Sequence, residues 1–185
     1  MINLREEFDI TDIRTIGNGS YSNVFGFIMY TRAHAYIAEV LSNQNFWNEL
    51  DEISGPNWPI FAVRPHVVDP NANKKYTEYF SLDYRKDLPC FIAFQFNDDE
   101  SIEHVSLKLS NETLDKAFGS IREIVKVITN AEDRILPEYK HTNGVFMNVK
   151  LDIEAYEVRK KIIDNMKYVP FIKDLLLNLI GVNRH

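Results

Sequence analysis

The sequence predicts an α/β protein in which helices flank a mixed β-sheet. The prediction rests on residues 88–129, the most clearly patterned part of the chain. Residues 91–96 form a nearly continuous apolar run, which is typical of a strand covered on both faces. Residues 102–109 alternate between apolar and polar side chains, with one slip between Ile102 and Val105, which predicts a second strand. Apolar residues then recur at helical spacing: Leu114, Ala117, Phe118, Ile121, Ile124, Val125 and Ile128.

The N-terminal half supplies the remaining elements of the predicted sheet. They are a strand-like segment at 8–16, a strand at 21–30, a helix at 32–53 interrupted at 42–45, and a strand at 58–64. Gly17-Asn18-Gly19 predicts a turn between the first two strands. Gly55 and Pro56 are expected to end the helix, because glycine and proline both disfavour its continuation.

Residues 65–87 are the least regular part of the chain. Tyr76, Phe80, Leu82 and Tyr84 share one strand parity, which predicts an extra strand or hairpin arm. Lysines and tyrosines are interleaved here, a pattern that can bind single-stranded nucleic acid. The net charge of −6 disfavours a general nucleic-acid binder, so nucleic acid is not the expected partner.

The C-terminal part predicts one strand and two helices. Asn143-Gly144 is a turn signal, and the alternation over residues 145–151 predicts a strand. Asp152 is expected to cap a helix that runs to residue 167. Residues 168–180 predict a last helix that is apolar almost all round. A helix of this kind belongs either to the core or to a dimer interface, and the sequence favours both equally.

Pro89, the predicted hairpin after it and the helix that follows resemble the second half of a thioredoxin-like domain. In that superfamily the matching proline follows a cis peptide bond and lines the active site. The resemblance covers roughly residues 24–129 and is one of element order. A redox thioredoxin has Cys-x-x-Cys after its first strand, whereas the matching positions here are Thr31-Arg32-Ala33-His34. The resemblance therefore implies a thioredoxin-like domain without dithiol chemistry.

The predicted domain organisation has three segments that form one compact domain. They are an N-terminal strand and turn segment at 1–23, a thioredoxin-like core at 24–130 and a C-terminal extension at 131–185. Residues 1–60 carry 3 basic and 8 acidic side chains. We therefore expect an acidic surface on the N-terminal third, which would favour a basic partner.

Composition narrows the class of protein further. The single cysteine excludes an internal disulfide and a thiolate zinc cluster. The first residues lack a signal-peptide core, and no apolar run reaches membrane-spanning length, so we expect a cytoplasmic protein without a membrane span. His104 lies near acidic residues, but their spacing matches no metal-binding loop. Neither a metal nor a cofactor is expected.

The sequence contains no complete catalytic motif, so we predict a role in protein–protein interaction or assembly. The expected partner is another protein or a second copy of the chain. The predicted binding residues are Pro89 and three residues of the last helix: Phe171, Leu175 and Leu179.

The alternative is an enzyme or small-ligand binder that uses a cleft near Pro89. Its candidate catalytic residues are Arg32, His34 and Cys90. A cysteine in an apolar strand is more often a buried, unreactive thiol than a nucleophile, because reactivity needs exposure and a positive neighbour. The sequence leaves enzymatic activity open and favours the interaction role.

Overall fold

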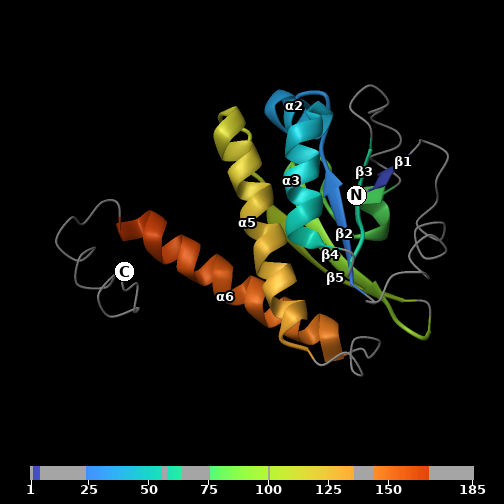
Figure 1. Ribbon diagram of the computed structural model, residues 1–185. Helices are drawn as coiled ribbons and strands as arrows, with labels where there is room; N and C mark the ends of the chain where they lie inside the picture. The colour runs from blue at the N-terminus through green and yellow to red at the C-terminus, as the bar shows by residue number, and fades with distance from the viewer. Residues whose placement is uncertain are drawn as a thin grey trace.

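A computed structural model describes residues 2–4, 24–55, 58–63, 76–99, 101–135 and 144–166 of the chain. Within these ranges helices flank a five-stranded mixed sheet, which confirms the predicted α/β class (Figure 1). The strand order is β1-β3-β2-β4-β5, with β1 at Ile2–Leu4, β2 at Phe25–Met29, β3 at Ile60–Val63, β4 at Cys90–Phe96 and β5 at Ile102–Lys108. Strands β1 and β2 run parallel to β3, whereas β4 runs antiparallel to β2 and to β5.

The described helices are α2 (Ala35–Ser42), α3 (Gln44–Ser54), α5 (Leu114–Asp133) and α6 (Gly144–Met166). Helices α2 and α3 pack against α5 on one face of the sheet (Figure 1). The interruption predicted at 42–45 is the junction of α2 and α3. There the Asn43 side chain accepts a hydrogen bond from the Asn45 amide (2.9 Å) and caps α3. Across the described ranges, no helix combines the length and the apolar character needed to cross a bilayer.

Strand β2 lies at the centre of the sheet, and all of its residues are buried. On one face, the Phe27 ring meets the edge of Tyr76, with ring centroids 5.0 Å apart, and it also contacts Phe80. Phe80 in turn packs edge-on against Phe94 of β4. Residues 76–82 therefore cover the face of the sheet opposite the helices.

Gly26 of β2 faces the helical layer and leaves no room for a side chain. A Cβ atom at this position would lie 2.7 Å from the Trp58 ring and 2.8 Å from the Phe91 ring. The Trp58 indole N–H donates to the Thr129 hydroxyl of α5 (3.3 Å). The glycine thus leaves room for the Trp58 ring between the sheet and α5.

The strand predicted at residues 145–151 is wrong, because this segment is the start of helix α6. Val145, Val149 and Ile153 are buried at a spacing of four, which places them on one side of the helix. Val145 and Val149 are also separated by an even number of residues, as side chains on one face of a strand are. The alternation in the sequence therefore fitted a strand as well as a helix. The C-terminal extension therefore contains no strand within residues 144–166.

The extra strand predicted through residues 76–84 is also wrong. Residues 76–79 form a helical turn, and Tyr76 and Phe80 are buried neighbours one turn apart. The predicted segments at 8–16 and 168–180 lie outside the described residues. The three-segment division of the chain stays a prediction.

Candidate functional site

The turn before β4 carries the proline that the sequence singled out. The Leu88–Pro89 peptide bond is cis, and both residues are buried. The backbone carbonyl of Pro89 accepts a hydrogen bond from the Leu109 amide (3.0 Å), which ties the turn to the end of β5. The proline is therefore part of the packed sheet edge.

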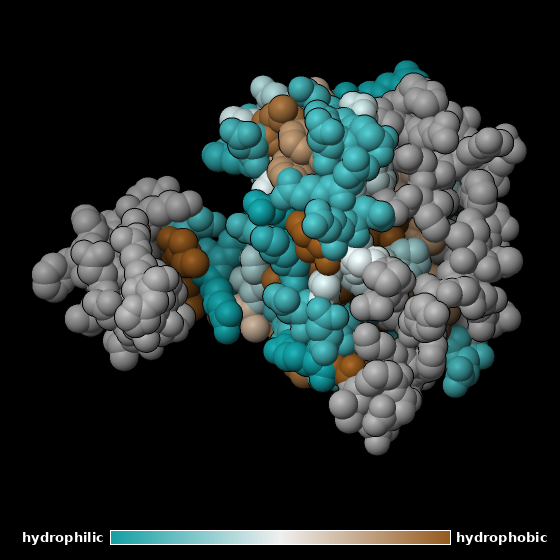
Figure 2. All heavy atoms as spheres, viewed as in Figure 1, coloured by the Kyte–Doolittle hydropathy of each residue, from teal (hydrophilic) through white to brown (hydrophobic). Residues whose placement is uncertain are grey.

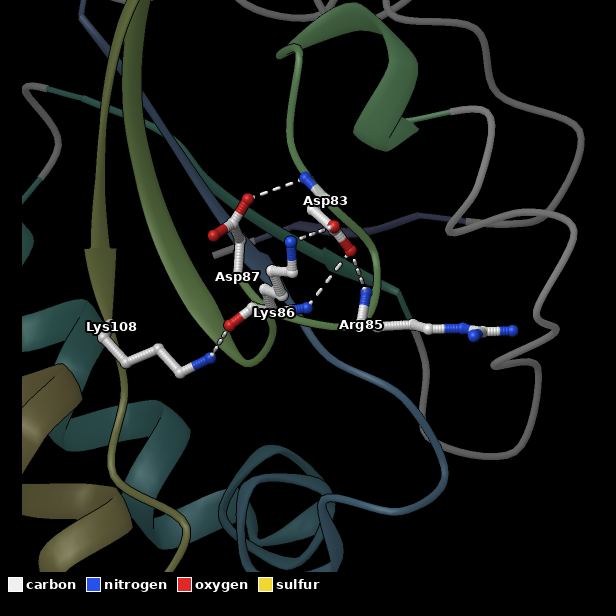
Figure 3. A network of polar contacts seen from close by, with 5 residues as sticks. All are labelled: Asp83, Arg85, Lys86, Asp87 and Lys108. Atoms are coloured by element: carbon white, nitrogen blue, oxygen red, sulfur yellow. Dashed lines mark hydrogen bonds and ion pairs between the residues drawn. The ribbon is translucent and has the colours of Figure 1, made fainter.

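A network of hydrogen bonds shapes the loop that leads to this proline (Figure 3). The Asp83 carboxylate accepts from the Arg85 amide (2.8 Å) and the Lys86 amide (3.3 Å). The Asp83 amide in turn donates to the Asp87 carboxylate (2.6 Å). The hydrogen bond from the Arg85 amide is the main reason that the pKa of Asp83 lies below its ordinary value. The amides of Asp83, Arg85 and Lys86 are thus satisfied by carboxylates of the loop itself.

Lys108 fixes the same loop from the end of β5. Its ammonium group donates to the backbone carbonyls of Lys86 and Leu88, at 2.6 Å each (Figure 3). Hydrogen bonds from a charged donor are stronger than neutral ones. The Leu88 carbonyl, next to Pro89, and the Lys86 carbonyl are therefore both hydrogen-bonded to a side chain of the protein.

The Thr31-Arg32-Ala33-His34 turn follows β2 at the same edge of the sheet, because Met29 of β2 pairs with Cys90 of β4. The Thr31 amide donates to Nδ1 of His34 (2.9 Å). Partial burial and the charge of Lys108 lower the pKa of His34. His34 is therefore neutral at pH 7, with its proton on Nε2, since Nδ1 is the acceptor.

The N-terminus of α2, which begins just after this turn, is capped by a distant residue. The Asn111 side-chain oxygen accepts from the amides of Tyr36 (3.1 Å) and Ile37 (3.2 Å). Asn111 lies in the connection between β5 and α5. The cap of α5 is a different residue, Thr113, whose side chain accepts a hydrogen bond from the Lys116 amide. Asn111 thus takes up two backbone donors of α2 that could otherwise bind an anion.

Cys90 is buried, and burial raises the pKa of its thiol to about 12, with Lys108 lowering it and Asp87 raising it by smaller amounts. The thiolate form, which is the nucleophile, is therefore almost absent at pH 7. The local environment is that of a packed apolar residue.

The structure brings some of the predicted site residues together. Pro89, Cys90 and His34 lie at one edge of the sheet, and Lys108 acts on both Cys90 and His34. Arg32 lies in the same turn as His34 and is exposed. The predicted binding residues of the last helix lie outside the described residues: Phe171, Leu175 and Leu179.

Sequence reasoning missed Lys108 and Asn111, which organise this edge. In the sequence, Lys108 stands among the polar residues of the predicted strand at 102–109, and Asn111 stands in the connection before the predicted helix. A lysine at the end of a strand and an asparagine before a helix are both ordinary patterns. Neither residue therefore carried a signal of its long-range contacts.

A second feature of the surface is an apolar stripe on α6, which we call the outer face. Its large residues are Met147, Leu151, Val158 and Ile162, with side chains 52%, 55%, 56% and 41% exposed. They lie on the side of α6 opposite the buried Val145, Val149 and Ile153. The second half of α6 extends past α5, and hydrophobic side chains reach the surface there (Figures 1 and 2).

A groove of about 750 Å³ runs between the β5–α5 connection, α5 and α6. Lysines and carboxylates both line it, among them Lys116, Lys160, Asp115 and Glu123. Because the two signs of charge are mixed, the groove favours no single class of small ligand.

The fold and the site define an α/β domain with a proline turn and no dithiol. Comparison of the chain with protein-family models, curated proteins and solved structures finds no match. The functional argument therefore rests on the geometry described above.

Proposed function

We propose that this chain is a non-redox thioredoxin-like domain that acts in protein–protein interaction or assembly. The observation that carries the proposal is the outer face of α6. A helix of a monomeric domain normally has one apolar stripe, which it buries, whereas α6 has a second stripe that faces outward. Contiguous exposed apolar surface of this kind is typical of an interaction site.

The thioredoxin-like part of the proposal is supported by the arrangement of the sheet. The parallel strands β1, β3 and β2 precede an antiparallel β4–β5 hairpin, and α5 follows that hairpin. The turn at residues 31–34 has no cysteine, and the thiol of Cys90 is buried. We include a cytoplasmic location in the proposal, on the sequence features given above.

The edge of the sheet near Pro89 supports the interaction role over small-ligand chemistry. The carbonyls of Lys86 and Leu88 are held by Lys108, and two amides of α2 are held by Asn111. Groups that a ligand would need are thus satisfied within the protein. An enzymatic or ligand-binding role for Arg32 and His34 stays the alternative.

The proposal is tested by placing a photo-crosslinking amino acid at Val158 in cells that produce the protein. The matched control is Lys126, an exposed position on α5. We expect an adduct with a discrete protein chain from position 158 and a much weaker adduct from position 126.

Equal labelling at both positions, or no adduct at 158, would contradict a role for the outer face in binding proteins. A loss of fold is checked by far-UV circular dichroism on both variants. Because the two substituted side chains are exposed, both proteins are expected to fold.

A further inference from the structure

We propose that the outer face of α6 pairs with the same face of a second copy of this chain, with the two helices antiparallel. This inference rests on the proposed function, because it names the partner of the surface assigned there. It is carried by the spacing of the apolar residues on α6 and by the charges on either side of them.

The seam of the outer face has the spacing of a helix–helix interface. Leu151, Ala155, Val158 and Ile162 are exposed and separated by four, three and four residues. This alternation of four and three keeps one row of side chains facing a partner helix. Ala155 lies in the middle of the row, where its small side chain allows the two helices to approach closely.

An antiparallel pair has a register in which each residue of the seam lies opposite another residue of the seam. With Leu151 opposite Ile162 of the second copy, Ala155 lies opposite Val158 of the second copy. The two-fold axis then passes near the middle of the seam, and the contact is the same from both sides. A symmetric, self-complementary contact closes as a dimer.

The charges beside the seam fit this arrangement. Glu154 and Lys161 flank one side of the seam, and Asp152 and Arg159 flank the other. When two helices run antiparallel, each flank faces the same flank of its partner. The register therefore places Glu154 near Lys161 of the second copy and Asp152 near Arg159 of the second copy.

Both pairings occur twice by symmetry and are attractive. Within the described residues, Glu154, Lys161 and Arg159 make no ion pair, whereas Asp152 already contacts Arg134. A parallel pair of the same helices would bring together only Glu154 and Arg159. The charge pattern thus favours the antiparallel dimer over the parallel one.

One short helix seam is smaller than the roughly 1,200 Å² that stable interfaces bury, so the dimer is expected to be weak. We expect the full chain to shift from monomer to dimer in sedimentation at concentrations on the order of 10–100 µM. The charge pairs provide a sharper test than the seam itself, because reversing exposed charges does not disturb the core.

The experiment compares four full-length variants by sedimentation equilibrium. Glu154→Lys and Lys161→Glu are each expected to weaken dimerisation about tenfold, because two attractive pairs become repulsive. The double variant E154K/K161E is expected to restore dimerisation to near the original strength. Glu39→Lys, an exposed change of equal charge on α2, is expected to have no effect. Circular dichroism of each variant excludes loss of helix as the cause.

The remaining outcomes each overturn the inference. Failure of the double variant to recover dimerisation would refute the antiparallel register. A chain that is monomeric at all concentrations would refute the pairing with a second copy. In that case an adduct between position 158 and a different protein would still support the proposed function. The absence of any adduct would contradict both the proposed function and the dimer.

Discussion

The cap of α2 by Asn111 gives the most direct test of how the sheet edge is held. The Asn111→Ala variant removes the acceptor of two backbone hydrogen bonds, from Tyr36 (3.1 Å) and Ile37 (3.2 Å). Loss of a helix cap costs about 0.5–2 kcal/mol. Water can replace part of the lost bonding, because the Tyr36 amide is near the surface. We therefore expect the free energy of unfolding to fall by about 1–2 kcal/mol.

This change is measured by urea unfolding and by the melting temperature, which is expected to fall by about 3–6 °C for a chain of this size. Asn111→Asp is the matched control. Its carboxylate can accept the same two hydrogen bonds, and a negative charge at a helix N-terminus is favourable. The aspartate variant is therefore expected to be at least as stable as the natural protein at pH 7.

Amide hydrogen exchange gives a local readout of the same bonds. In the alanine variant the amides of Tyr36 and Ile37 should exchange faster, while amides in the middle of α5 keep their protection. If the alanine variant unfolds at the same urea concentration as the natural protein, the reasoning is refuted. It is also refuted if the aspartate variant loses as much stability as the alanine variant.

Four further predictions concern two glycines and two titrating groups. Gly26→Ala should lower the free energy of unfolding by about 1–3 kcal/mol in urea titrations, because its Cβ would lie 2.7 Å from the Trp58 ring. Gly119→Ala, in an open position of α5, should instead raise it by about 0.5–1 kcal/mol. The Cys90 thiol has a pKa of about 12, so it should resist alkylation at pH 8 until urea unfolds the chain. Rapid labelling of the folded protein would contradict the burial of Cys90. The pKa of His34 is lowered in the folded state, so the unfolded chain binds a proton at this residue more readily as pH falls below about 6.5. The free energy of unfolding is therefore expected to decrease as the pH decreases. Urea titrations at about pH 7.5 and about pH 5.5 should show that the His34→Asn variant loses less free energy of unfolding between the two pH values than the natural protein does. An equal loss in both proteins would assign the effect to His104, whose pKa is also lowered.

The elements that the sequence predicted correctly are those with one clear period. The run at 91–96 became β4, the alternation at 102–109 became β5, and the stripe after Leu114 became α5. The sequence also predicted the break between α2 and α3, because a run of polar residues interrupts the apolar spacing.

Segments with apolar residues on two faces were predicted wrongly. In residues 145–151, Val145 and Val149 face the core, whereas Met147 and Leu151 face outward. All four share strand parity, so a helix with two apolar faces imitates an alternating strand. The outward-facing apolar residues of α6 made this segment look like a strand, and the proposed function rests on the same residues.

The candidate site could be predicted only in part. Pro89 stands out in the sequence, because a proline before an apolar strand is a local signal. The contacts of Lys108 and Asn111 depend on residues about 20 and about 75 positions away. Such contacts follow from the order of strands in the sheet, which the local pattern does not specify.

The order of the strands has a consequence for how the chain acquires its structure. Strands β4 and β5 and helix α5 are consecutive in the sequence, so the hairpin and its helix close through short loops. The central strand β2 pairs with β4, about 65 residues later, which requires a much larger loop to close. We therefore expect residues 90–133 to gain protection first in pulse-labelled hydrogen exchange during refolding. During synthesis, β2 and β3 would then stay without their central partner until the ribosome has made β4.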